Sequence, residues 1–194
     1  MRRTRRGIVA AIALVSTTLI VAACGSLMHG EGSRHHIYSS IEEVIGDSTL
    51  VIEATIVATS GVETGDGVGL TSLTPQVATQ YFPEGLGLSP VDGGKGGGAD
   101  PKLDSGEVQV LQAGAAGTGP APGLREGVTY LLFLTHSGLE GELAGAYFVT
   151  GAVAGIYEST DGGSSFTRVS EDDPALPTVL SKDDLAGWSP STLG

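Results

Sequence analysis

The chain has 194 residues, and its 22 aspartates and glutamates outnumber 10 lysines and arginines, for a formal net charge of −12. An acidic surface repels phosphate backbones, so we expect no nucleic acid among its partners. Glycine is abundant, with 31 residues, and aromatic residues make up only 5% of the chain. This length and composition suit one domain joined to flexible, glycine-rich segments.

The chain begins with the pattern of an export signal. Arginines at positions 2, 3, 5 and 6 precede an apolar run over residues 8–21, and the small residues Ala22 and Ala23 follow. A cleaved signal peptide has this order of charged, apolar and small-residue segments. The run is shorter than the roughly 20 residues that a membrane-spanning helix needs. We therefore expect residues 1–23 to be a signal peptide rather than a transmembrane anchor.

The sequence Val21-Ala22-Ala23-Cys24 resembles the lipobox of bacterial lipoproteins. The resemblance implies that the signal peptidase recognises Val21, Ala22 and Ala23, and that Cys24 carries acyl chains such as palmitate. Two or more chains anchor a protein stably. We therefore expect the protein at the cell membrane, attached through lipidated Cys24 on the outer, extracytoplasmic face. Residues 4–9 also fit a twin-arginine motif, so export of a folded or an unfolded chain remains open.

Cleavage after residue 23 would remove four arginines and no acidic residue, leaving six basic residues against 22 acidic ones and a net charge of −16. Membrane attachment would then depend on the lipid, because no basic patch remains to attract anionic headgroups. Cys24 is the only cysteine, so no disulfide within the chain is expected.

Residues 24–37 are expected to form a lipidated, flexible tether. A short helix is then predicted from Ser39 and Ser40, because each serine has a glutamate three positions later, which is the capping-box spacing. Alternating apolar and polar residues, apolar runs and glycine turns predict the strands that follow. These cover residues 50–59, 77–82, 106–112, 128–134, 147–150, 156–159 and 165–169. Glycine-rich tracts at 61–69, 85–98 and 114–123 are predicted to be loops.

We predict a mainly β fold, a small β-barrel or a sandwich with one or two short helices, over residues 38–170. Residues 171–194 are expected to be a C-terminal extension. It would contain one short helix from Ser181, with Asp184 at the capping-box position.

Two stretches, IEEVIGD at residues 41–47 and GVTYLLFL at 127–134, resemble bacterial secreted domains akin to the netrin and tissue-inhibitor group. Residues 147–157, YFVTGAVAGIY, are similar to actinobacterial lipoproteins of unknown function. The resemblance implies an OB-like five-stranded barrel over about two thirds of the mature chain. Animal inhibitors of that group chelate a protease zinc through a free N-terminal cysteine and contain disulfides. This sequence departs from them in both respects, because Cys24 is expected to be lipidated and has no partner.

No sequence motif indicates a catalytic, cofactor or metal site. The glycine-rich residues 93–98 lack the P-loop order, and the Gly-x-Ser-x-Gly elbow of serine hydrolases does not occur. The acidic runs at 171–173 and 183–184 lack the alternation of a calcium loop. No cysteine or histidine at zinc-ligand spacing completes a site with any of the four histidines, which are His29, His35, His36 and His136.

The sequence therefore favours a non-enzymatic binding or envelope-interaction module, with residues 60–73 and 83–105 as candidate contact loops. The expected partner is an envelope protein or ligand of unknown identity. Three alternatives remain open. They are an envelope enzyme acting on carbohydrate or with a bound metal, a protease-inhibitor-like module, and a spacer without a specific ligand.

Overall fold

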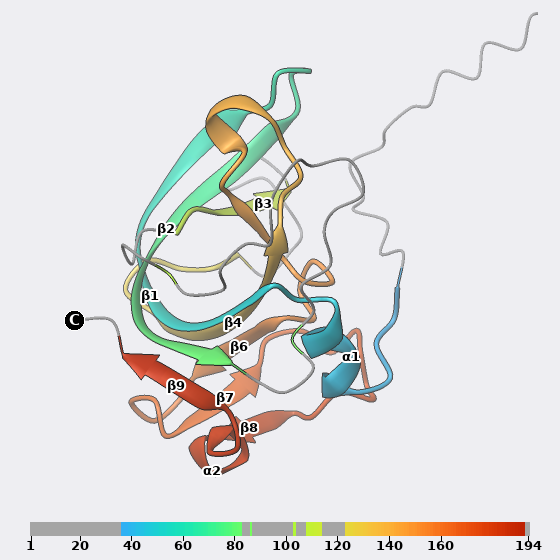
Figure 1. Ribbon diagram of the computed structural model, residues 1–194, viewed down its shortest axis with the longest axis vertical. Coiled ribbons are helices and arrows are strands. Elements are labelled where there is room, and N and C mark those ends of the chain that lie inside the picture. The colour runs from blue at the N-terminus through green and yellow to red at the C-terminus, as the bar shows by residue number, and fades with distance from the viewer. Residues whose placement is uncertain (1–35, 83–85, 87–102, 104–107, 114–122, 193–194) are drawn as a thin grey trace, which may run out of the picture.

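The computed structural model describes residues 36–82, 86, 103, 108–113 and 123–192, and within them nine strands pair into one sheet (Figure 1). The strands are β1 (Leu50–Glu63), β2 (Gly69–Phe82), β3 (Val110–Ala113), β4 (Thr129–His136), β5 (Tyr147–Val149), β6 (Ile156–Ser159), β7 (Ser165–Arg168), β8 (Val179–Ser181) and β9 (Ser189–Thr192). The helices are α1 (Ile41–Gly46), the 3₁₀ turn η1 (Gly141–Leu143) and α2 (Lys182–Leu185). The prediction of a mainly β fold with short helices is confirmed.

Five of the strands pair in a closed ring, which we call the five-stranded ring. Their order is β1-β2-β3-β5-β4, and β4 pairs back to β1. All of these pairings are antiparallel except that between β3 and β5, which is parallel. Outside the ring the sheet continues from β4 to β6, then to β7 and finally to β8.

The interior of the ring is filled by one apolar cluster to which all five strands contribute. Its members include Ile52, Val77, Val110, Leu132 and Val149, which are all buried. Because side chains alternate between the two faces of a strand, the neighbours of these residues face outward and need their own cover.

A second cluster covers the lower outer face of β1 and β4. Val51 and Phe133 pack there with Phe166 of β7, Leu180 of β8 and Leu185 of α2. Figure 1 shows these C-terminal elements together with β9 at one end of the molecule, with α1 beside them. A third, smaller cluster lies near the turn of the β1–β2 hairpin.

Both predicted helix starts are confirmed. The Ser40 hydroxyl accepts a hydrogen bond from the Glu43 N–H at 3.4 Å, while the Glu43 carboxylate accepts one from the Ser39 N–H at 2.8 Å. In α2, Ser181 and Asp184 form a complete capping box. Two negatively charged residues in the first turn of each helix also suit the positive end of its dipole.

The predicted loop over residues 60–73 was wrong, because these residues belong to the two longest strands. β1 continues to Glu63 and β2 begins at Gly69, and the register is continuous from the Ala58–Thr74 pair to the tip. The physical reason is burial: Leu70 and Leu73 are buried by elements distant in sequence, which offsets the weak strand preference of the glycines. Only residues 64–68 form the turn.

Residues 171–194, expected as an extension, add two strands to the same sheet. β8 pairs with β7, and β9 pairs with the last four residues of β2. Leu176, Leu180 and Leu185 are buried against the outer face of the ring. The apolar side chains of this segment therefore share the core of the residues before it.

Candidate functional site

An open groove with a volume of about 780 Å³ lies on the outer face of β2. Its lining comes from four separate segments: Val57 of β1, residues 72–76 of β2, residues 108–109 before β3, and the β4–β5 connection. The lining residues are Val57, Ser72, Thr74, Pro75, Gln76, Val108, Gln109, Glu142 and Gly145.

A β-bulge directs Val57 into this groove. The register between β1 and β2 shifts between Ile56, which pairs with Pro75, and Ala58, which pairs with Thr74. Val57 is thus the extra residue, and 51% of it is exposed although it lies in the middle of a long strand. Bulges bend the bulged strand and redirect a side chain, so Val57 forms an exposed apolar spot in the groove, whose lining also includes the buried residues Pro75 and Val108.

Neutral hydrogen-bonding groups surround this apolar spot. The Gln109 side-chain amide donates to the Ser72 hydroxyl at 2.8 Å, and this hydrogen bond fixes both side chains at one end of the groove. Thr74 and Gln76 are exposed and offer a hydroxyl and a carboxamide, each of which can donate and accept. Glu142 supplies the one charged group among the lining residues of the described chain.

The loop that carries Glu142 is held in place by apolar packing. Leu139 and Leu143 pack on Leu70, Leu111 and Phe148 of the ring, forming the third cluster. Figure 1 shows η1 beside the upper half of the β1–β2 hairpin. The Ser137 hydroxyl donates to the Leu143 carbonyl at 3.0 Å and accepts from the Leu139 N–H at 3.2 Å. This packing and the Ser137 hydrogen bonds therefore hold the segment of the groove lining that contains Glu142.

One edge of β2 has no strand partner along the groove among the residues that the structure describes. On one side β2 pairs with β1 almost throughout, and on the other it pairs with β3 at residues 70–73 and with β9 at residues 79–82. Residues 74–78 therefore have no strand partner on that side within the part of the chain that the structure describes. Pro75 lacks an N–H, and its position at an unpaired edge opposite a bulge is where a strand tolerates proline.

The residues predicted for lipid attachment and cleavage lie outside the described chain. These are Val21, Ala22, Ala23 and Cys24, and His29 and His35 lie there too. Of the candidate contact loop 83–105, only residues 86 and 103 are described, and neither lines the groove. Of the other candidate contact segment, residues 60–73, Ser72 lines the groove.

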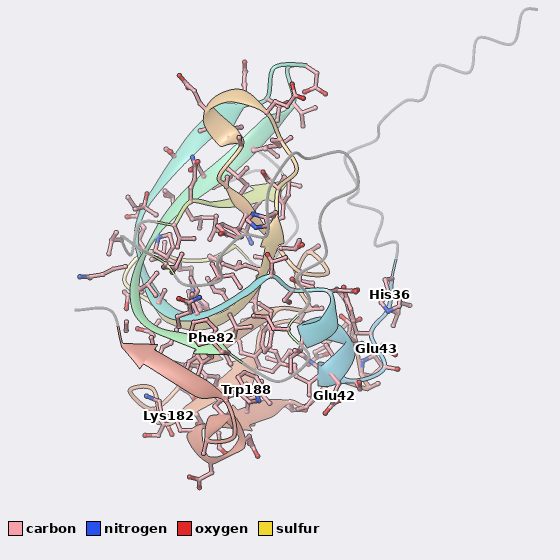
Figure 2. All side chains as sticks on the ribbon, viewed as in Figure 1. His36, Glu42, Glu43, Phe82, Lys182 and Trp188 are labelled. Atoms are coloured by element: carbon pink, nitrogen blue, oxygen red, sulfur yellow. The ribbon has the colours of Figure 1, made fainter. Side chains whose placement is uncertain are left out.

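The two described histidines make contacts elsewhere. His36 lies 3.6 Å from the Glu43 carboxylate. Figure 2 shows both residues at α1. His136 stacks on the Tyr147 ring, with 4.8 Å between ring centroids. The acidic runs are also used structurally. Asp184 caps α2, and buried Asp173 accepts a hydrogen bond from the Tyr38 N–H.

No group of three or more histidines, cysteines or carboxylates that could hold a metal ion occurs among the described residues. Nor does any helix described for this chain have the length and apolar character needed to cross a membrane. The sequence matches no protein-family model and no curated protein, and the fold matches no solved structure.

Sequence reasoning missed Thr74, Gln76, Gln109 and Glu142. Each is an ordinary polar residue in its local sequence, and only the closed ring brings the four segments together. One local signal was available, because a proline inside a strand indicates an edge or a bulge, and Pro75 lies at both.

Proposed function

We propose that this protein is a lipid-anchored, extracytoplasmic binding module without enzymatic activity, and that the groove along β2 is its binding surface. The observation that carries the proposal is the groove itself. It combines an apolar spot with neutral hydrogen-bonding side chains, and it lies between two well-packed regions of the outer face. Binding sites commonly join apolar area with a few placed polar groups in this way.

The membrane anchor in this proposal rests on the sequence of residues 1–24. A charged segment, a short apolar run and small residues before a lone cysteine fit a lipoprotein better than a spanning helix. The domain would be attached through the tether that ends at Ile37, because Tyr38 is the first buried residue among those that the structure describes.

An OB-like barrel is also part of the proposal. The closed ring of five strands and the placement of β5 between β3 and β4 support it, since an OB-fold is a five-stranded Greek-key barrel. OB-folds bind ligands on the face of strands 2 and 3 and with the loops beside it. The groove has the same location, with Thr74 on β2, Gln109 just before β3 and Glu142 on the β4–β5 loop.

The chemistry of the groove favours binding over catalysis. Hydrolysis of a glycoside commonly requires two carboxyl groups that flank the scissile bond, whereas the described lining contains the single carboxylate of Glu142. Hydroxyl and carboxamide groups such as those of Thr74 and Gln76 form hydrogen bonds without proton transfer at neutral pH.

Two experiments test the two halves of the proposal. Cys24→Ala in the full chain should abolish labelling with a palmitate analogue and move the protein out of the membrane fraction. Labelling that persists would contradict the anchor. For the groove, a photo-crosslinking amino acid at Gln76 should give a discrete adduct in the native envelope. The same group at Val179, which is also an exposed strand residue but lies outside the groove, should not. Identical adducts from both positions would contradict a binding groove.

A further inference from the structure

We infer that the groove accepts a short, extended segment of a partner protein, in which a lysine or arginine lies next to an apolar side chain. The inference rests on the proposed function and names the chemical class of its ligand. It depends on three properties of the groove, which are its charge, its apolar spot and the unpaired edge of β2.

The charge of the groove favours a cationic partner. Glu142 is exposed and is the one charged side chain among the described lining residues. The chain as a whole has a net charge of −12, so an anionic segment would be repelled as it approached. A lysine or arginine placed beside Glu142 would form a charge-assisted hydrogen bond to its carboxylate.

The exposed Val57 side chain favours an apolar group in the ligand. The bulge leaves the Val57 side chain half exposed in the groove, whereas Pro75 and Val108 of the lining are buried and the exposed residues Thr74 and Gln76 are polar. An aliphatic side chain of the partner would remove this area from water, at about 25 cal/mol for each Å² buried. A neutral oligosaccharide could hydrogen-bond to the hydroxyl, amide and carboxylate groups, but it would bring neither a positive charge to Glu142 nor an aliphatic side chain to Val57.

The unpaired edge of β2 suits an extended main chain. Over residues 74–78 the backbone has no described strand partner on the groove side, and an extended peptide can pair with such an edge. Pro75 removes one N–H donor from this stretch. Proline at an edge opposes the addition of a long strand, so the arrangement favours a short contact over aggregation.

The test uses the full chain in detergent micelles and fluorescent pools of nonapeptides. Two adjacent residues near the middle of each peptide are fixed and the others are random. The Lys-Leu pool should bind more tightly than the Glu-Leu pool and more tightly than a Lys-Ser pool. Glu142→Gln should weaken binding of the Lys-Leu pool by about threefold to fivefold, as expected for an exposed ion pair. Glu140→Gln is the matched control, because Glu140 is exposed on the same loop but does not line the groove.

Equal binding of the Lys-Leu and Glu-Leu pools, or equal effects of the Glu142 and Glu140 variants, would overturn the inference. A mixture of neutral oligosaccharides serves as the rival probe. If it binds in a way that depends on Gln76 and the peptides do not bind, the inference fails and the binding function stands. If no probe binds but the crosslinker at Gln76 gives its adduct, the inference also fails alone. If no probe binds and no adduct forms, the proposed function fails with it.

Discussion

The Glu53 carboxylate accepts a hydrogen bond from the Tyr81 hydroxyl at 3.0 Å, between β1 and β2 on the outer face of the five-stranded ring. Both residues are buried, and the same carboxylate oxygen lies 3.4 Å from the Lys182 ammonium of α2. Lys182 is half exposed, so its ion pair is screened by water while the hydrogen bond is not. Figure 2 shows Lys182 at the C-terminal end of the molecule, near Trp188, whose ring packs edge-on against Tyr81.

We expect Tyr81→Phe to destabilise the protein more than Lys182→Met does. The tyrosine variant removes a hydrogen bond to a buried carboxylate, which should lower the free energy of unfolding by about 1.5–3 kcal/mol. The lysine variant removes a partly exposed ion pair, worth at most about 1 kcal/mol. Urea denaturation of both single variants and the double variant measures the two costs and their coupling. A larger loss for Lys182→Met would show that the ion pair dominates.

Tyr157→Phe should not lower the free energy of unfolding, in contrast to Tyr81→Phe. The Tyr157 side chain is fully buried, and its hydroxyl has no hydrogen-bond partner among the described residues. A buried hydroxyl without a partner costs about 1–3 kcal/mol, so its removal should leave the free energy of unfolding unchanged or raise it. Because the ring contact with Phe133 is retained in the variant, packing changes little. A loss as large as that of Tyr81→Phe would show that the hydroxyl is bonded in solution, for example to water.

Stability should fall at alkaline pH because of three buried or partly buried tyrosines. Burial raises the pKa of Tyr157 to about 12, and it also raises the pKa of Tyr147. The pKa of Tyr81 is raised first by burial and then by the charge of Glu53. In the unfolded chain each tyrosine has a pKa near 10. Below that pH both states are protonated and the stability is fully present.

Above a pH of about 10 the unfolded chain loses these protons before the folded protein does, so unfolding becomes more favourable as the pH rises. Each tyrosine contributes a slope of at most about 1.4 kcal/mol per pH unit. Urea denaturation at several pH values from 8 upward measures this decline. Tyr81→Phe should make it shallower. The same slope in the variant would contradict the assignment of the effect to this residue.

Alternating apolar and polar residues predicted that β1 begins at Leu50, because the first half of this strand is buried. A nearly continuous apolar run predicted β4 from residue 128, one residue before its observed start. The alternation did not predict where β1 ends, since the bulge at Val57 changes which face the following residues present. Beyond the bulge the glycines and serines have loop-like character, and the strand there is stabilised by distant leucines such as Leu143. The groove escaped prediction for the same reason, because Gln76 and Glu142 become neighbours only through the closure of the ring.

The C-terminal segment shows the same limit of local patterns. Acidic residues at 171–173 and two prolines nearby are typical of a solvated extension, and each leucine that follows is isolated in sequence. In the fold these leucines lie on the outer face of β4, where Phe133 would otherwise be exposed. A sheet with an apolar outer face needs such a cover, but the sequence does not specify which segment provides it.

Leu180→Ala should therefore destabilise the whole domain. Leu180 is buried in the cluster with Phe133, Tyr157 and Phe166, and removing such a side chain costs about 2–5 kcal/mol. The neighbouring Val179 is 49% exposed and provides the matched control, because Val179→Ala should cost about 0.5 kcal/mol or less. Urea denaturation monitored by Trp188 fluorescence and by circular dichroism should give one transition, shifted to lower urea for Leu180→Ala only. If the fluorescence transition shifts while the circular dichroism transition does not, the C-terminal segment unfolds separately and is an extension after all.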